Sequence, residues 1–328
     1  MMKRKHRCFA LFSGGLDSIL AVLHMKNLGY EVLPIFFSTP FFGSDKAQET
    51  ANKIGFDLIV HDLTDLHLKM IEKPKYGYGK NLNPCIDCHG LMFHEAGRLM
   101  KEYNVDFIIS GEVMGQRPMS QRKDALNAVG KLSEIKDLLI RPLSQKLLAD
   151  TLPIRERWVI KDEMLDIQGR NRKRQIKLAE EYGIDFYPSP GGGCLLTDAG
   201  FSRKLLDLMQ HNMMNRKSIE FLKTGRHFRL NDNVKLIIGR NKDENNILSE
   251  LAKDEIVLQA KDISGPLGII QSKENLTTEE IKLTCSLLLR YNSKIDNSAI
   301  VQYGKNFQMN DEINVEKMAE EKVKQYLL

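Results

Sequence analysis

The chain has few cysteines and no long apolar segment, and both absences narrow the class of protein. Five cysteines among 328 residues are an odd number, which does not suit the disulfide framework of a small secreted domain. No apolar run approaches the ~20 residues that a membrane-spanning helix needs. The basic segment at residues 1–7 leads into a predicted strand without the apolar region of a signal peptide. We therefore expect a cytoplasmic protein without a membrane partner.

The net charge also lacks a strong bias, but the basic residues are unevenly distributed. The formal charge is only +5, whereas five of the eight residues at 170–177 are Lys or Arg. Clusters of like charge often bind polyanions, although a solvated helix face also explains this one. A second basic group contains Arg216, Lys217, Lys223, Arg226, His227 and Arg229.

A glycine-rich turn between a predicted strand and a predicted helix indicates a phosphate-binding site. Residues 7–12 predict a strand and residues 18–28 a helix, and no Walker-type Gly-Lys-Ser/Thr follows the turn. Backbone N–H groups and the helix dipole favour phosphate at such a helix start. A bare phosphate would repel Asp17, so we expect a Mg²⁺ ion there. The predicted nucleotide-binding residues are Ser13, Gly14, Gly15, Asp17 and Ser18.

Strands and helices alternate through the first half of the chain. This alternation predicts an α/β fold, a doubly wound parallel sheet with helices on both faces. Ligands bind at the carboxyl ends of such strands, where residues 13–17 and 110–112 both fall. The predicted strands are 7–12, 31–38, 57–61, 107–110 and 138–143, and the predicted helices are 18–28, 45–54 and 86–102.

The C-terminal part lacks this alternation and predicts a separate α+β domain. We expect strands at 234–238, 256–259 and 267–270 and a helix at 278–291. The predicted domains are 1–200, with the phosphate-binding turn and the cysteines, a helical connector at 201–225, and a C-terminal domain at 226–328.

Three cysteines form a candidate chemical site. Cys85 and Cys88 form a Cys-x-x-Cys pair at the start of a predicted helix, and Cys194 follows a glycine-rich turn at 188–193. The three thiolates fit an iron–sulfur cluster with one open iron, persulfide chemistry, or structural zinc with His89 as fourth ligand. Core packing explains the other two cysteines, at positions 8 and 285.

Together these motifs resemble the tRNA thiolation branch of the PP-loop ATP pyrophosphatases. Residues 13–18 match their Ser-Gly-Gly-x-Asp-Ser signature. Residues 83–88 and 188–194 resemble the two cysteine segments of the tRNA 2-thiouridylases. Residues 110–116 are similar to the Gly-Glu-x-x-Gly-Gln segment of the tRNA 4-thiouridine synthetases. Residues 225–300 are similar to the NFACT RNA-binding domain, which would supply a module for tRNA.

The resemblance implies an adenine nucleotide alpha hydrolase-like PP-loop domain and an ATP-dependent tRNA uridine sulfurtransferase. Such an enzyme adenylates a uridine carbonyl oxygen in tRNA, releases pyrophosphate, and then replaces AMP with sulfur. The segment at 110–116 favours 4-thiouridine at tRNA position 8, whereas the cysteine segments favour 2-thiouridine at the anticodon. The implied catalytic residues are Asp17, Cys85 and Cys194, and Gly111 and Gln116 would line the nucleotide pocket.

We expect Cys85, Cys88 and Cys194 to ligate a 4Fe–4S cluster, because a persulfide relay would leave one of the three without a role. The expected cofactors are thus ATP, Mg²⁺ and this cluster, and the sulfur donor is sulfide or a cysteine desulfurase. Two other functions are open: an RNA-binding protein with an inactive PP-loop, and a PP-loop enzyme for a small molecule. The sequence leaves the oligomeric state open. Expected tRNA phosphate contacts are Arg172, Arg174, Arg226 and Arg229.

Overall fold

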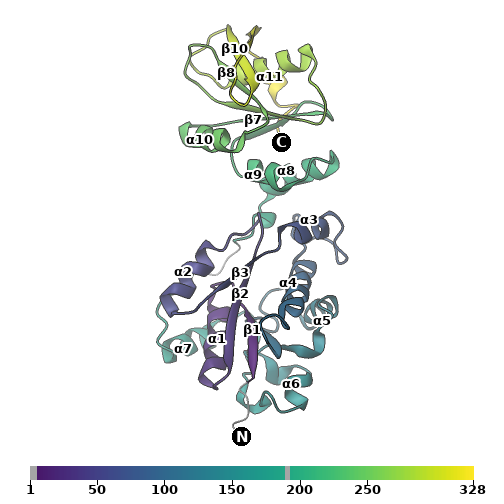
Figure 1. The fold of residues 1–328 in the computed structure, drawn as a ribbon, viewed down its shortest axis with the longest axis vertical. Coiled ribbons are helices and arrows are strands. Elements are labelled where there is room, and N and C mark those ends of the chain that lie inside the picture. Colours follow the sequence, from purple (N-terminus) through teal and green to yellow (C-terminus); the bar gives the residue numbers. More distant parts are fainter. Residues whose placement is uncertain (1–5, 189–192) are drawn as a thin grey trace. The chain divides into compact units, whose positions relative to one another are not determined.

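This computed structural model divides into two units, Met1–Thr197 and Asp198–Leu328 (Figure 1). The first unit contains a sheet of five parallel strands. The structure describes residues 6–188 and 193–328, so part of the glycine-rich turn predicted before Cys194 lies outside the described residues. No helix of the described part is long and apolar enough to cross a membrane.

The strand order of the first sheet is β3-β2-β1-β4-β5, as in a doubly wound fold that begins at its centre. All neighbouring strands run parallel, which confirms the predicted α/β fold. The last strand is shorter than the predicted 138–143, because Pro142 has no N–H for the ladder and Arg141 turns towards a buried carboxylate. The strands are β1 (Arg7–Leu11), β2 (Glu31–Ser38), β3 (Ile59–Asp62), β4 (Phe107–Ser110) and β5 (Leu139–Ile140).

Helices cover both faces of this sheet, because successive strand side chains point to opposite sides. Cys8 and Ala10 share a core with α1 and α2, whereas Phe9 and Ile35 share one with α4 and α5. The helices are α1 (Leu16–Asn27), α2 (Asp45–Ile54), α3 (Thr64–Glu72), α4 (Cys85–Leu99), α5 (Lys123–Leu132), α6 (Leu152–Arg155) and α7 (Lys173–Glu181), with 3₁₀ turns at Lys136–Leu138, Gln145–Leu147, Lys161–Glu163 and Leu195–Thr197.

The second unit contains an antiparallel sheet of order β11-β10-β8-β9-β7-β6, which confirms the predicted α+β class. Its strands are β6 (Arg226–Arg229), β7 (Val234–Ile238), β8 (Ile256–Ala260), β9 (Gly268–Ser272), β10 (Ser298–Lys305) and β11 (Asp311–Glu316). Its helices are α8 (Ala199–Gln210), α9 (Arg216–Leu222), α10 (Lys242–Leu251), α11 (Thr278–Arg290) and α12 (Glu320–Val323).

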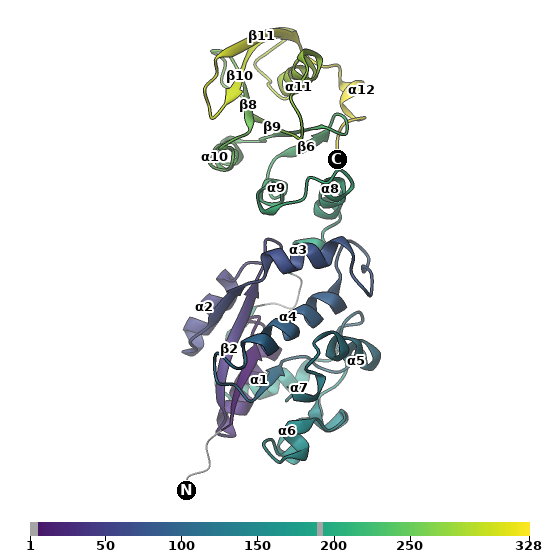
Figure 2. The ribbon, with the colours of Figure 1, turned by 45° about the vertical axis from the view of Figure 1, so that its right-hand side comes forward.

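Two apolar cores lie on opposite faces of the second sheet. Leu236 and Leu258 pack with α11 on one face, whereas Ile237 and Val257 pack with α9 and α10 on the other (Figure 2). Helix α11 begins at a capping box, in which Thr277 and Glu280 each bond the other's backbone N–H. The second unit begins at Asp198, so it includes α8 and α9, most of whose residues fall in the predicted connector at 201–225.

Candidate nucleotide and cysteine site

The turn between β1 and α1 is shaped so that its backbone can approach an anion. Gly15 precedes α1, and no side chain caps this helix. Gly14 has a φ of +73°, and a Cβ atom on it would lie 2.9 Å from the Cα atom of Ala47, so only glycine fits. The hydroxyl oxygens of Ser13 and Ser18 lie 3.3 Å apart beside the turn.

The end of β4 packs directly against the start of α1. A Cβ atom on Gly111 would lie 2.5 Å from the carbonyl carbon and oxygen of Asp17 and 2.6 Å from the backbone nitrogen of Ser18. Such distances are shorter than any real Cβ contact, so this approach of two backbones requires glycine. The structure thus brings the predicted nucleotide-binding residues of the two strand ends together.

A hydrogen bond joins the same two segments through side chains. Gln116 donates from Nε2 to Oδ2 of Asp17 at 2.5 Å. Oδ1 of Asp17 is buried and has no hydrogen-bond partner within residues 6–188 and 193–328. Burial raises the pKa of Asp17, and Gln116, Arg172 and Arg117 oppose that rise. A buried carboxylate oxygen without a partner, at a turn suited to phosphate, fits a Mg²⁺ ion that takes its other oxygen ligands from the phosphates.

The three cysteines of the predicted site also lie near one another. Burial raises the pKa of the Cys88 thiol well above its usual range, and Cys194 and Cys85 raise it further. Burial likewise raises the pKa of Cys194 to about 11, with a contribution from Cys85. All five cysteines are free, and Cys8 and Cys285 are buried in the cores, as expected.

Two histidines lie at this site in different roles. Nε2 of His67 in α3 lies 3.3 Å from Sγ of Cys88, and burial lowers the pKa of His67 to about 4. Nδ1 of His89 instead lies 3.0 Å from Oε1 of Glu112, so the predicted fourth zinc ligand already has a carboxylate partner. Among the described residues, no three His, Cys, Asp or Glu side chains are arranged as metal ligands. His67 is a single residue in an amphipathic segment, and no sequence pattern marks it.

Glu112 connects the nucleotide turn with the cysteine helix. Its Oε2 accepts from Nε of Arg141 at 2.8 Å and from the Ser110 hydroxyl at 3.2 Å, while Oε1 faces His89 in α4. Burial alone would raise the pKa of Glu112, but Arg141 and His89 lower it to about 2. Because Glu112 follows Gly111 and His89 follows Cys88, this network fixes the cysteine helix relative to the start of α1.

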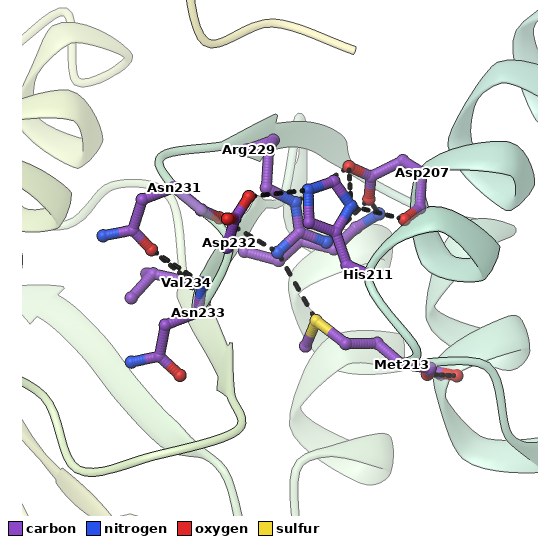
Figure 3. A network of polar contacts seen from close by, with 10 residues as sticks. Asp207, His211, Met213, Arg229, Asn231, Asp232, Asn233 and Val234 are labelled. Atoms are coloured by element: carbon purple, nitrogen blue, oxygen red, sulfur yellow. Dashed lines mark hydrogen bonds and ion pairs between the residues drawn. The ribbon is translucent and has the colours of Figure 1, made fainter.

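The structure corrects one predicted phosphate contact in the second basic group. Arg229 donates from Nε and Nη2 to the two carboxylate oxygens of Asp207, each at 2.8 Å, and its side chain is only 10% exposed (Figure 3). His227 is also buried, so neither residue presents a charge to RNA. Arg174 pairs with Asp166 at 2.6 Å, and the guanidinium of Arg226 lies over the Tyr291 ring.

Comparison with known proteins distinguishes the same two parts of the chain. Residues 4–146 match the family model described as Thiamine biosynthesis protein (ThiI), and residues 225–327 match the NFACT protein RNA binding domain. The chain therefore contains a segment that matches the ThiI family model, called the ThiI-family segment below, and a second segment that matches the NFACT RNA binding domain. The ThiI-family segment contains the PP-loop turn, Cys85, Cys88, Gly111 and Gln116, whereas Cys194 and α7 lie beyond it.

Proteins that are similar to part of the chain include two whose names refer to tRNA thiolation. A tRNA-specific 2-thiouridylase of Sulfurimonas denitrificans is 31% identical over 109 residues, 30% of this chain and 32% of that protein. A probable tRNA sulfurtransferase of Thermococcus kodakarensis is 25% identical over 188 residues, 55% of this chain and 44% of that protein. The chain thus spans less than half the length of either relative.

One solved structure with similarity to the chain is a complex of a 4-thiouridine synthetase with RNA and bound ATP. It is 21% identical, covers 54% of this chain and 50% of its own chain, and has a TM-score of 0.35.

Proposed function

We propose that the protein is an ATP-dependent tRNA uridine sulfurtransferase. The observation that carries the proposal is the convergence of two nucleotide motifs, through Gly111 against Asp17 and through Gln116 bonded to Asp17. Cys85, Cys88 and Cys194 are free thiols of the same unit, and His89, which contacts Glu112, follows Cys88 in α4. The similarity to a ThiI family model and to named tRNA sulfurtransferases supports tRNA as the substrate.

In the first step the uridine carbonyl oxygen attacks the α-phosphorus of ATP, and pyrophosphate leaves. The uncapped N–H groups of the turn, with Ser13 and Ser18, would bind the phosphates, and Asp17 would hold Mg²⁺. Gly111 and Gln116 would line the nucleotide pocket. Adenylation makes the second step possible, because AMP leaves readily from carbon whereas a bare carbonyl oxygen does not.

In the second step a sulfur nucleophile attacks the activated carbon, and AMP leaves. The uridine must leave its stack in the tRNA to reach this buried site. Of the two products, we favour 4-thiouridine at position 8, because the Gly-Glu-x-x-Gly-Gln segment belongs to the nucleotide pocket itself. Similarity to a 2-thiouridylase keeps 2-thiouridine as the alternative product.

The three thiols would hold the proposed 4Fe–4S cluster, which when bound would supply an open iron for sulfide. Burial and the two other thiols raise the pKa of Cys88, and burial and Cys85 raise that of Cys194. Cluster ligation, which requires thiolates, would oppose both effects. Asn83 donates to Sγ of Cys85 at 3.4 Å and His67 lies against Cys88, so two of the three sulfurs already have an outer partner.

Substitution of Asp17 by Asn tests the adenylation step. The change keeps the shape and the bond to Gln116 but removes the charge that Mg²⁺ needs, so we expect at least a ~100-fold loss of pyrophosphate release. Affinity for tRNA should remain within about twofold, since tRNA phosphates are bound by basic side chains and Asp17 is a carboxylate with one buried oxygen. Pyrophosphate release at the wild-type rate would contradict the assignment, and mass spectrometry of the tRNA nucleosides identifies the product.

Anaerobic reconstitution with iron and sulfide tests the cluster. We expect about four irons per chain in the wild type, none in Cys88→Ser, and an unchanged content in Cys285→Ala, whose thiol lies in the core of the second unit. An iron-free protein that still thiolates tRNA would favour the persulfide relay, in which Cys88→Ser would keep its activity.

A further inference from the structure

Arg172 is a cation near the nucleotide turn that pairs with no acidic residue in the described part of the chain. It lies outside the ThiI-family segment, immediately before α7, and it is half-buried. Its Nε atom is buried and has no hydrogen-bond partner among the residues that the structure describes. A buried N–H donor without an acceptor is rare in folded proteins. Such a donor therefore suggests that the residue binds a ligand.

A short relay of side chains holds this arginine near Asp17. Gln116 bonds Asp17 at 2.5 Å, and the Gln116 carbonyl oxygen accepts from Nε2 of Gln175 at 2.8 Å. Gln175 is completely buried in the first turn of α7. Arg172 and Gln175 are three residues apart, a spacing that places both on one face of the helix. The relay therefore directs Arg172 to the side of α7 that faces the start of α1.

The electrostatics agree with this placement. The positive charge of Arg172 is near enough to Asp17 to lower its pKa against the effect of burial. Nevertheless no ion pair joins the two residues among those described, so the guanidinium donors of Arg172 stay available. Its neighbours in the basic segment differ: Arg174 pairs with Asp166, and Lys177 is exposed.

We propose that Arg172 binds the triphosphate of the nucleotide and neutralises the pyrophosphate that leaves during adenylation. This inference rests on the proposed function and assigns a residue to it. A guanidinium can bond two phosphate oxygens at once, and in a partly dehydrated site that contact is stronger than in water. A tRNA phosphate is the less suitable ligand, because its contacts lie on exposed surface whereas Nε of Arg172 is buried.

The test compares binding of two nucleotides to Arg172→Gln, with the full-length protein and Mg²⁺. The probes are α,β-methylene-ATP, which carries the triphosphate but is not cleaved between the α and β phosphates, and AMP, which lacks the β and γ phosphates. We expect Arg172→Gln to lower the affinity for α,β-methylene-ATP about 10- to 100-fold and the affinity for AMP less than about twofold. Arg172→Lys keeps the charge but cannot bond two phosphate oxygens as a guanidinium does. Its affinity for α,β-methylene-ATP should lie between those of the wild type and Arg172→Gln.

Lys177→Gln is the matched control, since it removes one positive charge from an exposed position of the same helix. Equal affinities of Arg172→Gln and Lys177→Gln for α,β-methylene-ATP would overturn the inference while leaving the proposed function intact. The inference would also be overturned if Arg172→Gln lost as much affinity for AMP as for α,β-methylene-ATP, or if it lost affinity only for tRNA. If the wild type itself bound no α,β-methylene-ATP, the proposed function would fail together with the inference. Thermal unfolding of each variant checks that the fold is retained.

Discussion

Glu112 keeps a negative charge in the interior of the first unit because three side chains stabilise it. Its pKa of about 2 lies below the ordinary value of 4.5, since Arg141 and His89 outweigh the effect of burial. A carboxylate with a depressed folded-state pKa contributes stability that is complete above the unfolded-state pKa. That contribution is lost as the pH falls from 4.5 towards 2.

Substitution of Glu112 by Gln should therefore lower the free energy of unfolding by about 3 kcal/mol at pH 7, the equivalent of its pKa shift. The loss should shrink as the pH falls below 4.5, because the wild type then loses the same contribution. Urea unfolding at pH 7 and pH 4 measures both effects, with exposed Glu102→Gln as control. A stability at pH 7 equal to that of the control would show that the network is not stabilising.

At the scale of elements, α8 supplies the charge that the second sheet needs. Lys235 in β7 is completely buried, and its ammonium lies 2.6 Å from a carboxylate oxygen of Asp207 in α8. Burial lowers the pKa of Lys235 to about 8, although Asp207 opposes that effect. The same carboxylate pairs with Arg229 in β6. The sheet without α8 would contain two buried cations without a partner, which is strongly destabilising.

The sequence predicts elements well where their pattern is local. Strands β1 to β4 and helices α1, α2 and α4 follow from apolar runs and helical periodicity. Helix α3 and strands β10 and β11 are missing from the prediction. Strand β11 is largely polar and resembles a loop, whereas α3 and β10 contain apolar residues that indicate an element. The short β5 shows the opposite error, because Arg141 and Pro142 end the ladder inside the predicted strand 138–143.

The site shows the same division between local and distant information. Glycine spacing predicts the turn at residues 13–15, because the glycines are required by backbone geometry within the turn itself. The bond from Gln116 to Asp17 spans 99 residues, and the contact of His67 with Cys88 depends on how α3 packs on α4. No spacing in the sequence measures such distances. The resemblance to known motifs assigned Asp17 and Gln116 to one nucleotide site, and the structure shows which of their atoms are in contact.

At the scale of the whole molecule, each unit has its own cores, so we expect the nucleotide site to function without the second unit. Removal of residues 198–328 should leave the affinity for α,β-methylene-ATP unchanged. It should weaken tRNA binding and flatten its salt dependence, because phosphate contacts release counterions. Filter binding of tRNA at several salt concentrations measures the slope. An unchanged slope would assign tRNA binding to the first unit.

The pairing of Asp207 with Arg229 and Lys235 also has a consequence for how such a protein could be assembled from separate genes. The RNA-binding-domain match begins at residue 225, but the charges buried in its sheet are neutralised from residue 207. A recombination event that copied only the matched segment would transfer a sheet with unpaired cations. The structural module therefore begins at residue 198, and we expect a stable fusion to carry α8 and α9 along with the sheet.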